Sequence, residues 1–353
     1  MTFKGYYKNL LVQSDTAFPQ TESYTLDLNR LRLEARGRPA NWFAFEVQYN
    51  NEALLGSYLD TAQFAQLKAA RPATYWDLED NYVDQQSLLL RHRLHRGFVN
   101  INSAALDVTL GRQRIAWGSG RMWNPTDLFN PYNPAQLERD ERTGVDAVLV
   151  EKNFSALSRL SLAYAPQRNT TASRAVRYRT HFANTDMAWM VGEFRTTRTA
   201  GFEFAGRIAD AGVFGEVAHS RPAARDAYTR GVLGVEYAFE NTLTLGVEYY
   251  WNGEGTIHRS DYDFARLFAG EIQNLAQHYT GAHLRYDVTP LLRSENHLIL
   301  NHDDASLLFA PSLVYSLTSD WDAIAGMQWF SGDTDSEYGR FHNVYYMYLQ
   351  RFF

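Results

Sequence analysis

The sequence predicts an all-β fold, a transmembrane antiparallel β-barrel of about eighteen strands. Three observations lead to this prediction. Apolar residues alternate with polar or small ones along many segments, the connections between segments are short at one rim and long at the other, and the polar face of the segments is rich in charge. A barrel that turns its apolar face to lipid and its polar face to a wet lumen explains all three.

Composition excludes several other classes of protein. The chain has 353 residues, 45% of them hydrophobic, and a mean hydropathy of −0.40. Its uncharged apolar runs, such as 188–191, are far shorter than the ~20 residues of a membrane-spanning helix. The 14% aromatic content is too high for a disordered chain. With no cysteine there are no disulfides, c-type haem attachments, iron–sulfur clusters or cysteine-bound zinc, and the net charge of −6 argues against nucleic acid as a partner.

Alternation with a period of two identifies the strands. Phe43, Phe45 and Val47 occupy every second position, and the same pattern runs from Leu243 to Trp251. Applied along the chain, this criterion predicts strands near residues 2–15, 21–36, 41–50, 84–99, 105–114, 143–152, 156–166, 174–182, 186–194, 200–208, 212–220, 228–239, 242–252, 276–287, 292–301, 304–315, 320–331 and 340–353.

The connections sort by length between the two rims. Long segments at 51–83, 115–142, 253–275 and 332–339 fall on one side, and short turns, such as 37–40, 183–185 and 318–320, fall on the other. Long extracellular loops and short periplasmic turns are typical of barrels in the bacterial outer membrane. We therefore expect one outer-membrane barrel over residues 1–353. The loops 51–83, 115–142 and 253–275 are candidates for folding into its lumen.

The two ends of the chain agree with this location. Residues 1–20 contain no signal peptide, so we expect the mature form of an exported protein from which the signal has been removed. The last strand ends at Phe353 after alternating aromatic residues. That ending resembles the insertion signal of bacterial outer-membrane barrels.

The most distinctive segment is 111–142. It reads Gly111-Arg112-Gln113-Arg114, then Trp117-Gly118-Ser119-Gly120-Arg121, then Asn124-Pro125-Thr126-Asp127. Glycine and proline disfavour regular structure while the aromatic residues favour burial, so we expect a loop that folds inward and narrows the lumen. Here the chain resembles the alginate-export type of outer-membrane porin, which shares the Gly-Arg-Gln strand end and the Trp-Gly turn over roughly thirty residues. The resemblance implies eighteen strands and a porin function.

Charged residues on the polar faces are the candidate pore lining. Arg30 and Arg32 belong to a basic arc, and glutamates from later strands form a more acidic arc opposite. The complete set of candidates is Arg91, Arg93, His95, Arg159, Arg177, Arg179, His181, Glu203, Arg207, Glu236, Glu248 and Arg285. Rings of basic side chains favour anions, although such charges can also serve only to keep a lumen wet and to pair across strands.

Four further residues are candidates for the constriction loop: Arg112, Arg114, Arg121 and Asp127. Guanidinium groups suit carboxylates and phosphates. Strict alternation from Leu110 turns Arg112 and Arg114 outward, so an inward orientation requires a β-bulge near Gly111.

No motif points to catalysis or to a cofactor. His302-Asp303-Asp304 reads as a polar loop rather than a metal site, and His342 with Asn343 lacks the context of an outer-membrane phospholipase. We expect no catalytic residues, no metal and no cofactor. The expected function is diffusion of small polar, preferably anionic, solutes or polymers by a monomeric barrel in a lipid bilayer. Two alternatives stay open: a sheath around a separate multihaem cytochrome, and an outer-membrane hydrolase.

Overall fold

The alternating segments form the strands that the sequence predicts. The computed structural model describes residues 1–69, 74–131, 135–138, 144–168 and 170–353. Its strands are β1 (Thr2–Asp15), β2 (Ser23–Ala40), β3 (Phe43–Leu55), β4 (Glu79–Gln85), β5 (Leu88–Asn102), β6 (Asp107–Gln113), β7 (Val145–Asn153), β8 (Arg159–Ala165), β9 (Ser173–Phe182), β10 (Thr185–Phe194), β11 (Thr197–Ile208), β12 (Ala211–Pro222), β13 (Tyr228–Ala238), β14 (Leu243–Asn252), β15 (His278–Asp287), β16 (Leu292–Asn301), β17 (Leu307–Ser316), β18 (Trp321–Ser331) and β19 (Val344–Phe352).

Helical structure is confined to the connections. The two short α-helices are α1 (Ala62–Ala69) and α2 (Phe264–Phe268), and single 3₁₀ turns lie at Ser57–Asp60, Arg259–Asp261 and Tyr338–Arg340. Over the described residues, none of the helices has the length and apolar character needed to cross a membrane.

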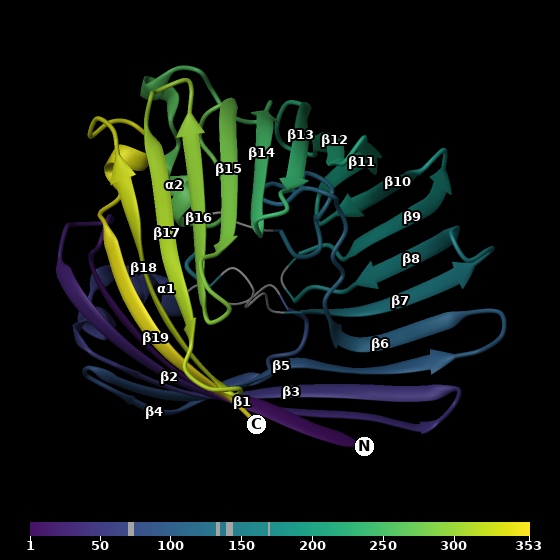
Figure 1. Ribbon diagram of the computed structural model, residues 1–353, viewed down its shortest axis with the longest axis horizontal. Coiled ribbons are helices and arrows are strands. Elements are labelled where there is room, and N and C mark those ends of the chain that lie inside the picture. The colour runs from purple at the N-terminus through teal and green to yellow at the C-terminus, as the bar shows by residue number, and fades with distance from the viewer. Residues whose placement is uncertain (70–73, 132–134, 139–143, 169) are drawn as a thin grey trace.

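The sheet closes on itself through the first and last strands. Neighbouring strands pair antiparallel, with β3 joined to β5 in place of β4, and β1 pairs with both β2 and β19 through Tyr6↔Arg32 and Tyr6↔Phe352. The strands follow one another around a ring, with the two chain ends side by side (Figure 1). A closed ring leaves no unpaired edge, so every strand can satisfy its backbone groups inside a bilayer. The predicted closed, antiparallel barrel is confirmed.

One strand stands outside the ring. Of the 19 strands described, β4 pairs only with the first half of β5, while β6 pairs with the second half of β5. The remaining eighteen close the barrel, as predicted. The alternation had merged β4 and β5 into one predicted strand at 84–99. The turn between them, Gln86-Ser87, contains no glycine or asparagine, although Ser87 has a φ of 59°.

Side chains on the two faces of the wall differ as the alternation predicts. On β13 the outward Leu233 is 58% exposed, and on β14 the inward Glu248 is fully buried. Outward positions are mostly apolar or aromatic, whereas many inward positions carry charged, amide or small side chains. This arrangement reverses that of a water-soluble barrel and matches a transmembrane one.

Connections at the two ends of the barrel differ in length. The turn end carries short connections such as Ala183-Asn184, in which both residues have positive φ, as two-residue hairpins require. The loop end carries residues 56–87, 114–144, 253–277 and 332–343. The predicted loop boundaries need adjustment, because 51–55 continue β3, 79–83 belong to β4, and 37–40 is a bulged end of β2 rather than a turn.

Candidate functional site in the barrel lumen

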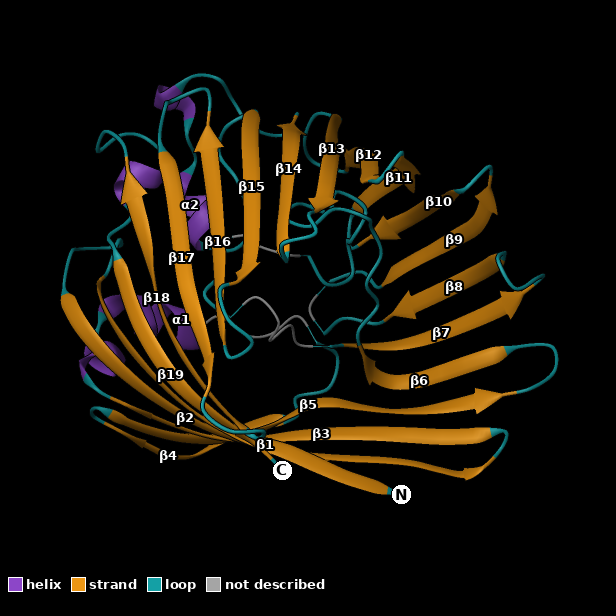
Figure 2. Ribbon diagram, viewed as in Figure 1, coloured by secondary structure: helices purple, strands orange, loops and turns teal. Residues whose placement is uncertain are grey.

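A loop crosses the inside of the barrel. Residues 114–131 leave β6 and contact the wall on the far side of the ring, at β12 and β14. Loop segments fill the centre of the ring of strands (Figure 2). The sequence predicted that this segment turns inward, and the following contacts show how the fold holds it there.

Glu216, on β12, receives four hydrogen bonds from the loop. The backbone N–H groups of Ser119, Gly120 and Thr126 donate to its carboxylate at 2.6, 2.7 and 3.0 Å, and the Thr126 hydroxyl donates at 2.8 Å. Several donors converging on one carboxylate form an anion-binding nest, the strongest kind of neutral-to-charged hydrogen bonding in proteins. Glu216 therefore anchors the start and the end of the loop's turn to the same point of the wall.

Glu248, on β14, holds the tip of the loop. The backbone N–H groups of Arg121, Met122 and Trp123 donate to its carboxylate at 2.5, 3.1 and 3.3 Å. The indole of Trp123 stacks on the ring of Tyr250 at a centroid distance of 5.1 Å. We call Glu216 and Glu248 the carboxylate latch, because together they receive the backbone donors of residues 119–126.

The loop can make these contacts only because of its glycines. Gly118 has a φ of +105°, which a side chain disfavours. A Cβ on Gly120 would stand 2.0 Å from the carbonyl oxygen of Trp123. The Gly-Ser-Gly sequence that reads as a turn is thus the segment that presents its backbone donors to Glu216.

Alanines on the opposite wall make room for the aromatic side chains of the loop. Ile115, Trp117 and Phe129 are buried together against inward-facing alanines of the neighbouring strands: Ala147, Ala163, Ala165 and Ala175. The rings of Trp117 and Phe129 meet edge to face at 5.3 Å. Small residues in the wall and large ones in the loop form one close-packed unit, which holds this part of the loop against the wall.

A third buried carboxyl group, that of Glu337, supports the tip of the loop from behind. Glu337 precedes the turn Tyr338–Arg340 and accepts hydrogen bonds from the Leu275 amide at 3.2 Å, the Asn301 amide at 2.9 Å and the Tyr279 hydroxyl at 2.5 Å. Tyr279 and Tyr338 belong to the apolar cluster that buries Trp123. Burial raises the pKa of Glu337 to about 7.

The raised pKa of Glu337 predicts a dependence of stability on pH. An acid with a raised pKa in the folded state stabilises fully below its ordinary value of 4.5, and this stabilisation is lost as the pH rises through about 7. The wild type should lose about 3 kcal/mol between these limits relative to Glu337→Gln, which stays neutral. Thermal unfolding of both proteins from about pH 4 to about pH 8 measures the difference. Parallel profiles would contradict the prediction.

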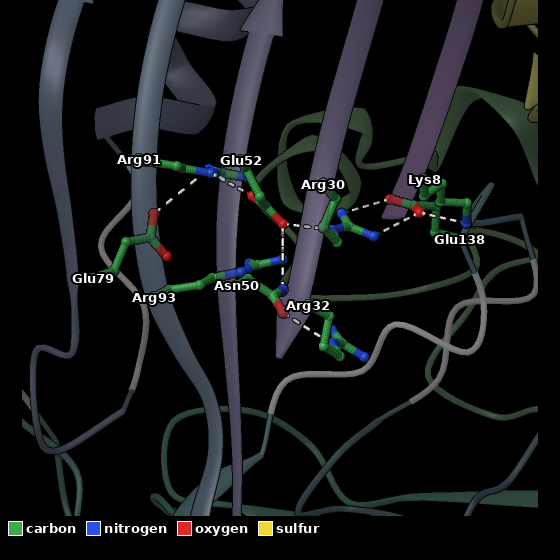
Figure 3. Close-up of polar contacts among 9 residues, drawn as sticks. All are labelled: Lys8, Arg30, Arg32, Asn50, Glu52, Glu79, Arg91, Arg93 and Glu138. Carbon is green, nitrogen blue, oxygen red and sulfur yellow. Dashed lines mark hydrogen bonds and ion pairs between the residues drawn. The ribbon is translucent and has the colours of Figure 1, made fainter. Parts of the chain in front are cut away.

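Arginines from two strands, β2 and β5, surround one buried carboxylate on the other side of the lumen. Glu52, on β3, accepts from Nε of Arg30 at 2.6 Å, from Nε of Arg91 at 2.7 Å and from Nη2 of Arg93 at 3.1 Å. Arg32 donates to Asn50 at 2.8 Å. We call Lys8, Arg30, Arg32, Arg91 and Arg93, with their carboxylates Glu52, Glu79 and Glu138, the arginine cluster (Figure 3).

Glu138 connects the arginine cluster to the lumen loop. Its carboxylate accepts from both terminal nitrogens of Arg30, at 2.8 and 3.0 Å, and from Lys8 at 3.0 Å. Although burial opposes the charge, Arg30 and Lys8 hold the pKa of Glu138 below its ordinary value. The loop that starts at β6 is therefore tied to β12 and β14 at one point and to β1 and β2 at another.

A hollow of about 350 Å³ lies between the loop and the wall. Arg121 of the loop pairs there with Glu236 at 3.3 Å, Arg179 pairs with Asp186 at 2.8 Å, and Arg177 pairs with Glu203. The predicted basic and acidic groups thus meet in this hollow instead of occupying separate arcs.

The structure places the predicted pore-lining residues on inward positions of their strands. These are Arg91, Arg93, His95, Arg159, Arg177, Arg179, His181, Glu203, Arg207, Glu236, Glu248 and Arg285. They are not equally accessible, since His95 and Glu248 are fully buried, whereas Arg159, Arg207 and Arg285 are exposed. His181 lies 3.0 Å from Asp186.

Two features of the predicted constriction differ from expectation. The ladders on both sides of β6 run without a register shift through Gly111, so the expected bulge is absent from these described pairings. Arg112 is buried in the wall, where it donates to Asp146 at 2.9 and 3.0 Å and to the Trp76 carbonyl at 2.6 Å. A guanidinium enclosed in this way is structural. Arg114 is exposed, and Asp127 is buried in the loop.

Three carboxylates at the centre of the site were not predicted from the sequence. Glu52 fell inside the predicted loop 51–83, although it continues the alternation of β3. Glu216 alternates with Phe214 and Ala218 in a predicted strand, so the period of two could have identified it as inward. Glu138 lies in a loop without periodicity, and only its contacts reveal it.

The fold is similar to that of solved outer-membrane porins. The outer membrane protein OpdK of Pseudomonas aeruginosa matches with a TM-score of 0.61 and 9% identity, covering 99% of this chain and 98% of that chain. OccAB1 of Acinetobacter baumannii matches with a TM-score of 0.62 and 9% identity, covering 99% and 96%. A porin of Rhodopseudomonas blastica, a triple mutant, matches with a TM-score of 0.51 and 10% identity, covering 100% and 99%.

These comparisons define the class of fold. At such low identity they show that the chain has the closed barrel of a bacterial outer-membrane porin, and they do not single out the alginate-export type. Neither a family model nor a curated protein matches the sequence.

Proposed function

We propose that this protein is a porin of the bacterial outer membrane through which small polar solutes diffuse, with a preference for anions. In this proposal the loop end faces the outside of the cell and the turn end faces the periplasm. A single barrel suffices, and no catalytic reaction is assigned. The support comes from the fold of the solved porins, the charged inner wall and the inward loop that narrows the lumen.

Unequal burial of the lumen charges carries the anion preference. The carboxylates of Glu203, Glu216 and Glu248 lie beneath the loop and are 7% exposed or less. The side chains of Arg121 and Arg179, by contrast, are 51% and 52% exposed. In the arginine cluster, the side chains of Arg91 and Arg93 are 22% and 17% exposed, whereas that of Glu52 is fully buried. A solute in the lumen therefore meets more positive than negative charge, although the whole chain is acidic.

A solved neighbour supports the same class of solute. OpdK of Pseudomonas aeruginosa, with 11% identity to this chain in that comparison, has been crystallised with vanillate, a small aromatic carboxylate. The resemblance of residues 111–142 to alginate-export porins points to anionic polymers as further solutes. Both kinds of solute carry carboxylates, which guanidinium groups bind well.

The channel proposal explains the loop better than the two alternatives do. A sheath around a cytochrome needs an open lumen, whereas residues 114–131 cross this lumen and are anchored to β12 and β14. A hydrolase at the rim needs a serine within reach of His342. The described contact of His342 is with Thr21 at 3.4 Å.

Channel activity is tested with the refolded full chain in a planar bilayer. We expect stable, ohmic current steps from single barrels. The double variant Arg91→Gln/Arg93→Gln should lower the chloride preference, because it removes two positive charges from the lumen. The matched variant Arg198→Gln/Arg221→Gln removes two charges from the outer face and should leave the preference unchanged. Absence of current steps from a folded barrel would contradict the proposal.

A further inference from the structure

A row of charge crosses the outer face of the barrel at its loop end. Arg174, Glu193, Arg198 and Arg221 are direct neighbours on β9, β10, β11 and β12. Glu193 is shared, with Arg174 at 2.7 Å and Arg198 at 3.9 Å, while Arg221 contacts His219 at 3.3 Å. One carboxylate therefore faces three guanidinium groups. Arg174 and Arg198 keep side-chain exposures of 70% and 82%.

A hollow lies directly beneath this row, on the side of the turn end. Leu162, Val176, Val191 and Ala200 are neighbours in the next outward row of the same strands. These side chains and the arginines above them line a hollow of about 790 Å³. The row below is aromatic, with the ring of Trp189 stacked on Tyr178 at 6.4 Å and tilted against Phe202 at 5.3 Å. Small residues between arginines and aromatic rings leave the hollow open.

The height of the charged row matches a lipid head-group region. On β9, Phe182 lies eight positions after Arg174 and is 71% exposed near the turn end. At ~3.3 Å per residue and a strand tilt of ~40°, this distance is about 20 Å along the barrel axis. The apolar band of such barrels is about 25 Å tall. At the same end, β14 and β18 carry the outward residues Trp251 and Trp329 instead of arginine.

We propose that this face binds a lipid that carries an exposed phosphate in its head group, from the leaflet at the loop end of the barrel. The phosphate binds between Arg198, Arg221 and Arg174, and one acyl chain lies in the hollow over Val191 and Ala200. Guanidinium forks bind phosphate through paired hydrogen bonds, and basic pockets at the membrane surface recognise anionic head groups. The site lies outside the lumen and is independent of the channel function.

Native mass spectrometry of the full-length barrel in neutral detergent tests this site. The probes are phosphatidic acid, diacylglycerol with the same acyl chains, and inorganic phosphate. We expect retention of phosphatidic acid but not of diacylglycerol, and no displacement by equimolar inorganic phosphate. The variant Arg174→Gln/Arg198→Gln/Arg221→Gln should bind phosphatidic acid about tenfold or more weakly. Val191→Trp, which fills the hollow and keeps the arginines, should also weaken binding.

A second triple variant controls for total charge. Arg159→Gln/Arg207→Gln/Arg285→Gln loses the same charge from the inner wall and should retain phosphatidic acid as the wild type does. Equal losses of phosphatidic acid binding in both triple variants would overturn the proposed site. Displacement by inorganic phosphate would reduce it to a simple anion site without an acyl chain and overturn the lipid proposal. If Arg174→Gln/Arg198→Gln/Arg221→Gln does not fold, the test rests on Val191→Trp. Binding of phosphatidic acid to Val191→Trp with the affinity of the wild type then overturns the proposal.

Discussion

Replacing both latch residues by glutamine, as Glu216→Gln/Glu248→Gln, should release the lumen loop and widen the channel. Six backbone N–H groups and one hydroxyl donate to these two carboxylates. Glutamine keeps one acceptor oxygen but turns an NH₂ group against the remaining donors. Hydrogen bonds to a charged group contribute about 1.5–3 kcal/mol each, so losing several should cost about 3–6 kcal/mol of loop docking.

Two measurements follow the release of the loop. Mean single-channel conductance should rise and the open current should become noisy. Trypsin should cleave faster after Arg121, which the latch holds in place through its backbone. The control is Glu295→Gln, which removes an inward carboxylate that pairs with Arg293 at 2.8 Å on β16. Wild-type conductance and wild-type cleavage in the latch variant would show that other contacts hold the loop.

The variant Glu52→Gln should cause the largest loss of barrel stability in the arginine cluster. Glu52 is buried and is the shared acceptor of Arg30, Arg91 and Arg93. Removing one partner of a buried ion pair leaves uncompensated charge and costs about 3–5 kcal/mol. Here three guanidinium groups lose their common carboxylate at once, while Arg30 keeps its ion pair with Glu138.

Thermal unfolding of the refolded barrel measures this loss. The matched control is Glu151→Gln, whose carboxylate pairs with Arg159 at 3.4 Å where the arginine side chain is 48% exposed. Exposed pairs contribute about 0–1 kcal/mol, so the control should unfold close to the wild type. Similar shifts of the unfolding temperature in the two variants would contradict the central role given to Glu52.

Much of the fold could be predicted because the alternation is a local signal. The outward residues Leu245 and Val247 and the inward Glu248 identify their faces without knowledge of any partner strand. Closure of the ring followed from the number of strands and from the sorting of the connections. The prediction was wrong where this local signal is absent. The turn Gln86-Ser87 contains no glycine or proline, so β4 and β5 were predicted as one strand.

The candidate site was harder to predict because its contacts join distant segments. The segment 111–142 was expected inside from its aromatic residues, but its anchoring depends on Glu216, which is distant in the sequence, and on Glu138, which belongs to no periodic pattern. Arg112, in contrast, was predicted to belong to the site and does not. Its predicted place in the constriction required a bulge near Gly111 against the alternation, yet the chain at Trp76 and Asp146 encloses it within the wall. Burial of this kind is decided by packing between loops and strands, which no spacing in the sequence records.

The most direct test of the proposed function is the reversal potential of wild-type single channels in a potassium chloride gradient. The acidic carboxylates beneath the loop are buried, whereas the side chains of Arg121 and Arg179 remain accessible. The account therefore predicts a permeability ratio of chloride to potassium above one, despite a net charge of −6 on the whole chain. A ratio below one, with stable open channels, would contradict the assignment of an anion-preferring porin.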